Sequence, residues 1–288
     1  MKRRLFMRFP EGKAKALTLS YDDGVQQDAR LIEILNRHGL KCTFNINSGS
    51  FAPEGKVYEA GRVHRRMTER ECVELYTNSG HEVAVHAYTH PFLEQLPQSG
   101  VVYEVMKDRE ALESIFGCII KGMAYPYGTL NNDVVEALRV CGISYSRTTV
   151  STEKFDIPTD WLRLPATCHH RNPKLMELAE KFTGYVPEKM EAPKLFYLWG
   201  HSYEFEGANN WHIIENFAEY MGGREDIWYA TNIQIYDYIK AYNSLEFSAD
   251  MSIVHNPSAL TVYFNFNGKN YTLASGETCV FEGVVRID

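Results

Sequence analysis

The sequence lacks closely paired cysteines, long hydrophobic runs and an excess of positive charge. Its six cysteines include no C-x-x-C pair, which disfavours a zinc ribbon or a thioredoxin-like redox site. Thirty Lys and Arg residues against 37 Asp and Glu residues leave a net charge of −7. We therefore expect neither nucleic acid nor membrane as a partner, because binding to either requires a positive field.

Targeting signals are also missing from the pattern. The basic start at residues 2–4 is followed by Arg8, Glu11 and Lys13 before any apolar run develops, whereas a signal peptide needs an apolar core at that point. No stretch reaches the roughly 20 apolar residues of a membrane-spanning helix. These features predict a cytoplasmic protein in a reducing compartment, with homo-oligomer formation left open.

Over residues 1–243, short apolar runs alternate with amphipathic segments of helical period. The expected strands are 17–21, 41–46, 82–86, 119–125, 143–147, 194–199 and 226–230. Strand–helix units in series indicate parallel strands with right-handed crossovers, in a doubly wound sheet or a barrel. A complete barrel has eight units in about 250 residues, so seven favour an α/β fold of the distorted, incomplete seven-unit (β/α) barrel type.

The pattern changes at residue 244. Residues 261–266 and 271–273 flank an Asn267-Gly268 turn, which predicts a β-hairpin, and residues 280–287 predict one more strand. Because about 45 residues bury little core of their own, we expect a barrel domain at 1–243 with a small β appendage at 244–288 packed on it.

Polar residues follow four of the predicted strands at their carboxyl ends, where parallel α/β folds collect their catalytic groups. Asp22-Asp23-Gly24 follows the first strand, and His86 to His90 follows the third. Pro126-Tyr127-Gly128 follows the fourth strand, and His201 follows the sixth. We expect these side chains to meet at one rim of the barrel.

Two histidines and one carboxylate make a suitable set of three protein ligands for a catalytic divalent metal. Gly24 permits a turn that brings both neighbouring aspartates to one site, so that one binds metal while the other handles protons. Pro91 disfavours a helix at His90, which favours a tight loop. The alternatives are an ordinary Asp-Asp-Gly turn and hydrogen-bonded structural histidines.

These segments resemble the motifs of a known family, the polysaccharide deacetylases with a NodB homology domain (carbohydrate esterase family 4). Residues 18–24 (Thr-Leu-Ser-Tyr-Asp-Asp-Gly) are similar to the first motif, and residues 86–90 to the second, with Ala87 where Ser or Thr is usual. Residues 125–128 resemble the third motif, and residues 198–201 resemble the Leu-x-x-His motif near the end. The four motifs occur in family order, and the family's distorted seven-unit barrel agrees with the predicted fold.

The resemblance implies a role for each matching residue. It implies Asp23, His86 and His90 as ligands of a divalent metal, with zinc first and cobalt, nickel or manganese as alternatives. It implies Asp22 as general base, His201 as general acid and the backbone N–H of Tyr127 as oxyanion donor.

Other residues of the same loops are candidates for substrate contact. Sugar rings pack on aromatic faces, and we expect Tyr88, Pro126, Trp161 and Trp199 to contact substrate; core packing is the alternative for at least half of the aromatic residues. His169-His170 is either a further substrate contact or a surface pair.

One position departs from the family pattern. The third motif usually begins with an arginine that orients the catalytic aspartate, and here that position is Ala124. Asp160-Trp161 resembles the fourth motif, whose aspartate pairs with that arginine. We hypothesise that Arg147 or Arg163 supplies the missing charge near Asp22.

The leading functional prediction is a metal-dependent hydrolase that removes acetyl groups from an N-acetylated carbohydrate, with O-acetylated sugar not separated from it. One alternative is a non-catalytic carbohydrate-binding barrel. A metal-independent amide hydrolase acting on other non-peptide C–N bonds is a third reading. The lack of an export signal favours a small acetylated oligosaccharide or sugar as the substrate.

Overall fold

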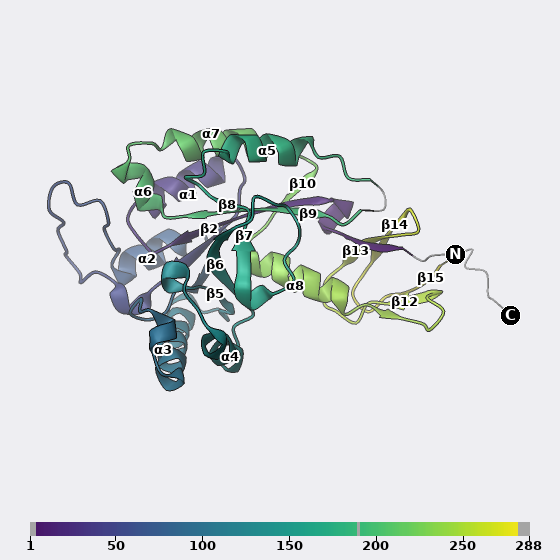
Figure 1. Cartoon of the computed structure of the whole chain (residues 1–288), viewed down its shortest axis with the longest axis horizontal. Coiled ribbons are helices and arrows are strands. Elements are labelled where there is room, and N and C mark those ends of the chain that lie inside the picture. The colour runs from purple at the N-terminus through teal and green to yellow at the C-terminus, as the bar shows by residue number, and fades with distance from the viewer. Residues whose placement is uncertain (1–3, 189–190, 282–288) are drawn as a thin grey trace.

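Short apolar strands alternate with amphipathic helices along most of the chain (Figure 1). The structure is a computed structural model that describes residues 4–188 and 191–281. Its central sheet is parallel throughout and runs in the order β7-β6-β5-β4-β3-β2-β9-β8. The strands are β2 (Lys15–Asp22), β3 (Cys42–Ile46), β4 (Glu82–Val85), β5 (Gly122–Ala124), β6 (Tyr145–Ser151), β7 (Leu164–Ala166), β8 (Cys168–His169) and β9 (Lys194–Gly200).

One segment joins the two ends of this row of strands. β7 pairs with β6, and β8 pairs with β9, although only Thr167 separates β7 from β8. The amide of Thr167 itself donates to the carbonyl of Tyr197, at 2.9 Å. The segment changes partner along its length, so the row curls into a distorted, incomplete (β/α) barrel, and the predicted fold class is confirmed.

The seventh barrel strand is a correction to the sequence prediction. Residues 226–230 were expected to fill it, but they form β10 (Ile227–Tyr229), which pairs with Lys15–Leu17 at the start of β2. β3 pairs further along the same edge of β2, so β10 and β3 share that edge. The seventh position belongs to residues 164–169, which are short and contain Pro165 and therefore give little strand signal.

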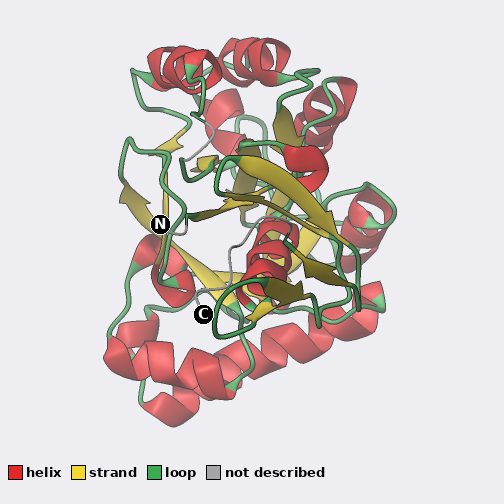
Figure 2. Ribbon diagram, turned by 90° about the vertical axis from the view of Figure 1, so that its right-hand side faces the viewer, coloured by secondary structure: helices red, strands yellow, loops and turns green. Residues whose placement is uncertain are grey.

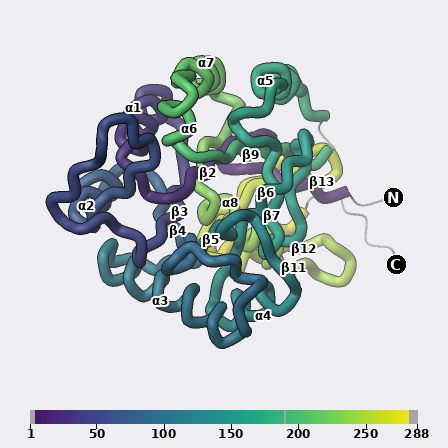
Figure 3. The backbone as a smooth tube through the Cα atoms, turned by 60° about the vertical axis from the view of Figure 1, so that its left-hand side comes forward, coloured from purple at the N-terminus to yellow at the C-terminus, as the bar shows by residue number. Residues whose placement is uncertain are grey.

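The helices lie around the outside of the strands (Figures 2 and 3), except that α8 lies at the end of the barrel beside the appendage (Figure 1). They are α1 (Asp28–Arg37), α2 (Glu69–Tyr76), α3 (Gln98–Phe116), α4 (Asn132–Val140), α5 (Leu175–Gly184), α6 (Ser202–Gly207), α7 (His212–Met221) and α8 (Asn232–Asn243). α2 begins with a capping box formed by Thr68 and Glu71. The side chain of Asn172, just before α5, accepts a hydrogen bond from the amide of Lys174 at 2.9 Å.

The barrel core explains why these helices pack where they do. Leu31, Ile34 and Leu35 lie on one face of α1 and are buried, as the predicted periodicity requires. They belong to one large apolar cluster that also includes Leu17, Leu19 and other residues of the central strands. Burial of such side chains contributes about 1.5–3 kcal/mol each, which holds the strand ends in fixed positions.

Two small antiparallel sheets pack at the other end of the molecule. β13 (Val262–Phe266) and β14 (Lys269–Leu273) form the predicted hairpin, and β1 (Leu5–Arg8) adds to its edge. β11 (Glu246–Phe247), β12 (Ile253–His255) and β15 (Thr278–Val280) form the second sheet. The predicted strand 280–287 lies mostly outside the described residues. Because β1 comes from the other end of the chain, the appendage contains residues from both ends.

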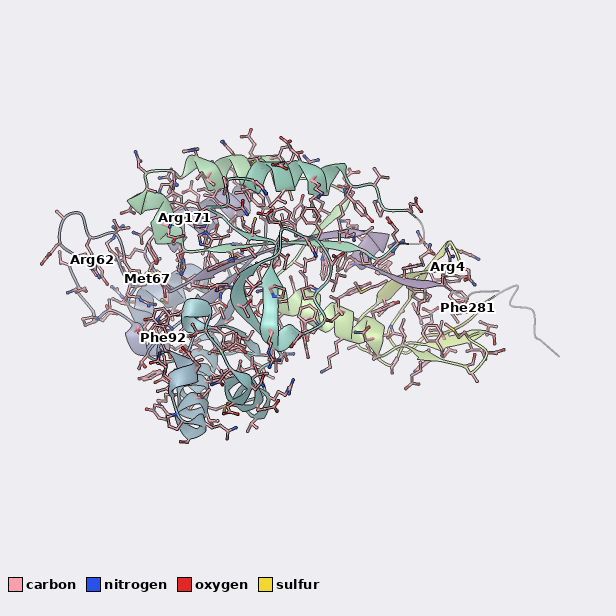
Figure 4. The ribbon with its side chains drawn as sticks, viewed as in Figure 1. Arg4, Arg62, Met67, Phe92, Arg171 and Phe281 are labelled. Carbon is pink, nitrogen blue, oxygen red and sulfur yellow. The ribbon has the colours of Figure 1, made fainter. Side chains whose placement is uncertain are left out.

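The carboxyl ends of the barrel strands lie at the end of the molecule opposite to the appendage. Figure 4 shows Met67, Phe92 and Arg171 at one end of the molecule and Arg4 and Phe281 at the opposite end. Within the described part of the chain, no helix has the length and apolarity needed to cross a membrane.

Candidate active site

Both aspartates of the first motif lie at one place because the chain turns sharply after β2. Asp23 has a φ of 89° and Gly24 a φ of 62°. Such left-handed backbone at a non-glycine residue costs about 1–3 kcal/mol and clusters at functional sites. The turn places Asp22 Oδ2 at 3.9 Å and Asp23 Oδ1 at 4.0 Å from His86 Nε2.

The two histidines of the second motif meet across a tight loop, as Pro91 predicted. Ala87 and His90 both have a φ of 61°, and the His86 and His90 rings lie 4.8 Å apart edge to face. His90 Nε2 is 3.8 Å from Asp23 Oδ1. The structure thus brings the predicted metal ligands Asp23, His86 and His90 together, with donor atoms within 4.8 Å of one another.

Surrounding groups fix the orientation of His86. Its Nδ1 lies 2.8 Å from the carbonyl oxygen of Ala124, so Nδ1 carries the proton and Nε2 presents its lone pair to Asp23. The His86 amide donates to the buried carboxylate of Asp108 at 3.0 Å. Asn47 donates to the carbonyls of His86 and Ala87. These contacts hold the loop in its strained shape.

Asp22 is held by partners on two other strands of the barrel. Arg147, from β6, donates to Asp22 Oδ2 inside the barrel, and Asn45, from β3, donates to Oδ1 at 2.8 Å. The structure thus places one of the two hypothesised arginines on Asp22. Arg163 instead pairs with Asp160 at 2.9 Å.

The charges around the two aspartates decide their ionisation. Burial raises the pKa of Asp22, but Arg147, His86 and His201 outweigh it, so the pKa lies below its usual value. Burial likewise opposes ionisation of Asp23, and contacts from His64 and Arg66 overcome it, so this pKa is also low. Both carboxylates are therefore ionised near neutral pH.

His64 and Arg66 are site residues that the sequence patterns did not reveal. His64 Nε2 lies 3.3 Å from Asp23 Oδ2, and Arg66 Nη2 lies 3.0 Å from Asp23 Oδ1. Both lie near the end of the long loop between β3 and α2 and approach Asp23 across about 40 residues of sequence. The sequence of that loop shows no periodicity, so no local pattern predicts that His64 and Arg66 lie at the site.

The imidazoles divide into two kinds by their surroundings. Burial lowers the pKa of His86, and burial with the neighbouring His86 lowers the pKa of His90 to about 4. Burial also disfavours charge on His201, but Glu204, Asp22 and Asp23 outweigh it and raise its pKa. His86 and His90 thus stay neutral, as metal ligands must, whereas His201 favours a proton. His201 Nε2 faces Asp22 Oδ2 at 3.8 Å.

Tyr127 sits in a 3-10 turn, Pro126–Gly128, after β5 and has a φ of 58°. Its side chain is 52% exposed. The ring contacts His90 edge to face at 4.5 Å and stacks on exposed Phe92 at 3.9 Å. The ring of Tyr127 therefore lies beside the metal-ligand group, and the role of its backbone N–H stays a prediction.

The predicted substrate contacts fall in different surroundings. Tyr88 is half-buried and its ring covers Gly49, while Pro126 is buried beside Tyr127. Trp199 is 8% exposed and lies between the guanidinium of Arg147 and the ring of His169. Trp161 packs against Tyr236 of α8, and no described contact joins it to the metal-ligand group.

The fold and the site define a (β/α) barrel protein with a candidate mononuclear metal site on its carboxyl rim. Residues 10–146 match the family model described as Polysaccharide deacetylase. The matched region contains Asp23, His86 and His90, the three residues predicted as metal ligands. Arg147 and His201 lie beyond the matched residues.

Individual relatives match parts of the chain. The peptidoglycan-N-acetylglucosamine deacetylase PgdA of Listeria monocytogenes is 27% identical over 140 residues, which are 48% of this chain and 27% of that protein. A chitin deacetylase of Pestalotiopsis sp is 25% identical over 150 residues, which are 52% of this chain and 46% of that protein. This chain thus covers less than half the length of either relative.

The fold is also found among solved structures. A Mycobacterium smegmatis protein classed with the polysaccharide deacetylases superposes with a TM-score of 0.57 at 16% identity. The match covers 82% of this chain and 93% of that one. The distorted barrel is therefore shared over most of both chains.

Proposed function

We propose that this chain is a metal-dependent hydrolase that removes acetyl groups from an N-acetylated carbohydrate. One observation carries the proposal: Asp22, Asp23, His86, His90 and His201 meet at one rim, with neighbouring donor atoms 3.8–4.0 Å apart. Relatives named for deacetylation of peptidoglycan N-acetylglucosamine and of chitin support the choice of substrate class.

The residues present fit a divalent metal. Asp23, His86 and His90 would hold it, because their donors converge and the two imidazoles favour the neutral form. Two nitrogens and one oxygen suit zinc first, and cobalt, nickel or manganese use similar donors. When bound, such a metal lowers the pKa of a coordinated water and polarises a carbonyl oxygen.

Asp22 is placed to act as the general base. Its carboxylate is ionised, and Arg147 and Asn45 fix both oxygens. A base held in this way takes the proton from the attacking water without first rearranging. General acid–base groups contribute about 10²–10⁴-fold to a rate.

His201 is placed to act as the general acid, because its raised pKa keeps a proton available near neutrality. An amine is a poor leaving group until it is protonated, so this proton favours an N-acetyl over an O-acetyl substrate. The backbone N–H of Tyr127 would stabilise the negative charge that develops on the acetyl carbonyl oxygen when water attacks the acetyl carbon. Tyr88, Pro126, Trp161 and Trp199 remain the proposed substrate contacts.

Acetate release from N-acetylglucosamine oligomers tests the proposal, together with metal analysis of the same preparations. Asp22→Asn keeps the shape of the side chain and removes the base. We expect it to retain one equivalent of metal and to lose at least about 100-fold in rate. Asp237→Asn is the matched control, since Asp237 lies on α8 and pairs with Lys121; we expect its rate to stay at the wild-type level.

Two outcomes would favour the other readings. Metal binding without acetate release from any acetylated sugar would indicate a non-catalytic carbohydrate-binding barrel. Acetate release that survives both a chelator and Asp22→Asn would indicate a metal-independent amide hydrolase.

A further inference from the structure

A second cluster of titratable side chains lies on the side of His201 away from Asp22. Glu204, in the first turn of α6, points its Oε2 at three imidazoles. Oε2 is 3.0 Å from His170 Nε2, 3.2 Å from His169 Nε2 and 3.8 Å from His201 Nδ1. One carboxylate oxygen therefore links the end of β8 to the end of β9.

Glu204 is held firmly by these neighbours. Its other oxygen, Oε1, accepts from Arg171 Nη1 at 3.2 Å, and its side chain is only 17% exposed. Burial raises the pKa of Glu204, but the three imidazoles outweigh burial and keep that pKa well below its usual value. A fixed, ionised carboxylate thus stands behind His201.

The distances between donor atoms in this cluster are short enough for a metal site. The donor atoms of His169, His201 and Glu204 lie within 4.8 Å of one another. The tautomer of His169 argues against a cation, because His169 Nδ1 accepts the Arg171 amide proton at 3.1 Å. The His169 Nε2 that faces Glu204 must then carry a proton and has no lone pair for a metal. His86 shows the opposite arrangement, with Nδ1 protonated and Nε2 available.

We propose that Glu204 is the positioning residue of His201, accepting its Nδ1–H so that Nε2 is turned toward Asp22 and the reacting atoms. The proposal rests on the role of His201 as general acid. The buried His201 Nδ1 has no hydrogen-bond partner among the described residues. It lies 3.8 Å from Glu204 Oε2, so a small rotation of the His201 ring brings the two atoms to hydrogen-bond distance. His169 and Arg171 hold Glu204 in place for it.

The charged and titratable groups that face His201 come from three parts of the chain. They are Asp22 and Asp23 at the end of β2, His169 and His170 at the end of β8, and Tyr203 and Glu204 from α6. Substitution of Glu204 alone leaves the others in place. A change in the behaviour of His201 in such a variant therefore reports on Glu204.

The test compares Glu204→Gln, Glu204→Asp and the control Glu219→Gln, an exposed glutamate of α7. In zinc-loaded protein, ¹⁵N NMR of histidine gives the tautomer of His201, and kinetics give kcat, KM and the pH profile. For Glu204→Gln we expect the Nδ1–H preference to be lost and kcat to fall about 10- to 100-fold with KM nearly unchanged. The alkaline limb of the profile moves to lower pH, because the proton on His201 loses its anionic partner. Glu204→Asp restores part of each effect, and Glu219→Gln has none.

An unchanged His201 tautomer and an unchanged kcat in Glu204→Gln would overturn the proposal. A second equivalent of zinc bound by the wild type and lost in Glu204→Gln would also overturn it, since the cluster would then hold a cation. If the wild type releases no acetate, the proposed function fails, while the NMR spectra still decide the positioning role. If Glu204→Gln does not fold, the wild type is compared with Glu204→Asp in the same NMR and kinetic measurements, and a smaller change in the same direction is expected.

Discussion

Arg147 and Asp22 form an ion pair that is almost wholly withdrawn from water. Their side chains are 1% and 3% exposed, and the ring of Trp199 covers the guanidinium at 4.4 Å. Arg147 of β6 pairs in register with Ala124 of β5, the position at which the family motif usually carries its arginine. The positive charge beside Asp22 therefore comes from β6 and not from the motif position on the adjacent strand β5.

Removal of this arginine is predicted to destabilise the fold. Arg147→Met leaves Asp22 buried without its cation, and breaking a buried pair in this way costs about 3–5 kcal/mol. Arg163→Met removes an exposed pair with Asp160 and is expected to cost less than about 1 kcal/mol. Urea unfolding measures both values. Equal stability of the two variants would show that Asp22 does not depend on Arg147.

Metal binding is predicted to depend on His90 rather than on histidine content in general. His90→Gln removes one of the three proposed donors, so we expect metal content after dialysis to fall from one equivalent to nearly none. His255→Gln is the matched control, because His255 lies in β12 and bonds Thr278 far from the site. Elemental analysis of both variants gives the answer, and one full equivalent in His90→Gln would contradict the ligand assignment.

A buried carboxyl group is predicted to make stability depend on pH. Burial raises the pKa of Asp28 from 3.8 to about 7, against hydrogen bonds from Ser202, Tyr76 and Val25. The folded protein then binds a proton more strongly than the unfolded chain. The contribution of Asp28 to the unfolding free energy is therefore complete below about pH 4 and declines as pH rises to 7, by roughly 4 kcal/mol.

Asp28→Asn cannot ionise and should lack this decline. Urea unfolding of the wild type and the variant between pH 4 and pH 8 measures the difference directly, since all other titrating groups are common to both. The wild type is expected to lose stability relative to the variant as pH rises. Parallel pH curves would mean that Asp28 titrates normally in the folded protein.

Gly200 is predicted to be essential for packing next to His201. A Cβ at this position would run into the ring of His170, which is 1% exposed and has no room to move. We expect Gly200→Ala to cost about 1–3 kcal/mol in unfolding free energy and to lower kcat, because His170 contacts Glu204. Gly184→Ala is the control, as a Cβ there meets nothing within 4 Å. Calorimetry that found equal melting temperatures for both would refute this expectation.

The sequence predicted the features that depend on local pattern. Hydrophobic periodicity predicted most of the strands. The positions of Asp22, His86 and His201 at strand ends predicted that these side chains meet at one rim of the barrel. The prediction failed where local signal was weak: residues 164–169 form the seventh barrel strand, and the expected seventh strand is β10. The ring of Trp161 contacts Tyr236, and its contact with substrate stays a prediction.

The positions of most strands, the reactive residue types and their spacing follow from the sequence by itself, because periodicity and turn chemistry act between near neighbours. The tertiary structure alone decided which distant charges meet them. Arg147 was one of two candidates until the register of β5 and β6 placed it on Asp22, and Arg66 reaches Asp23 from an irregular loop. Contacts between residues far apart in sequence depend on the packing of the whole barrel, and no short segment encodes them.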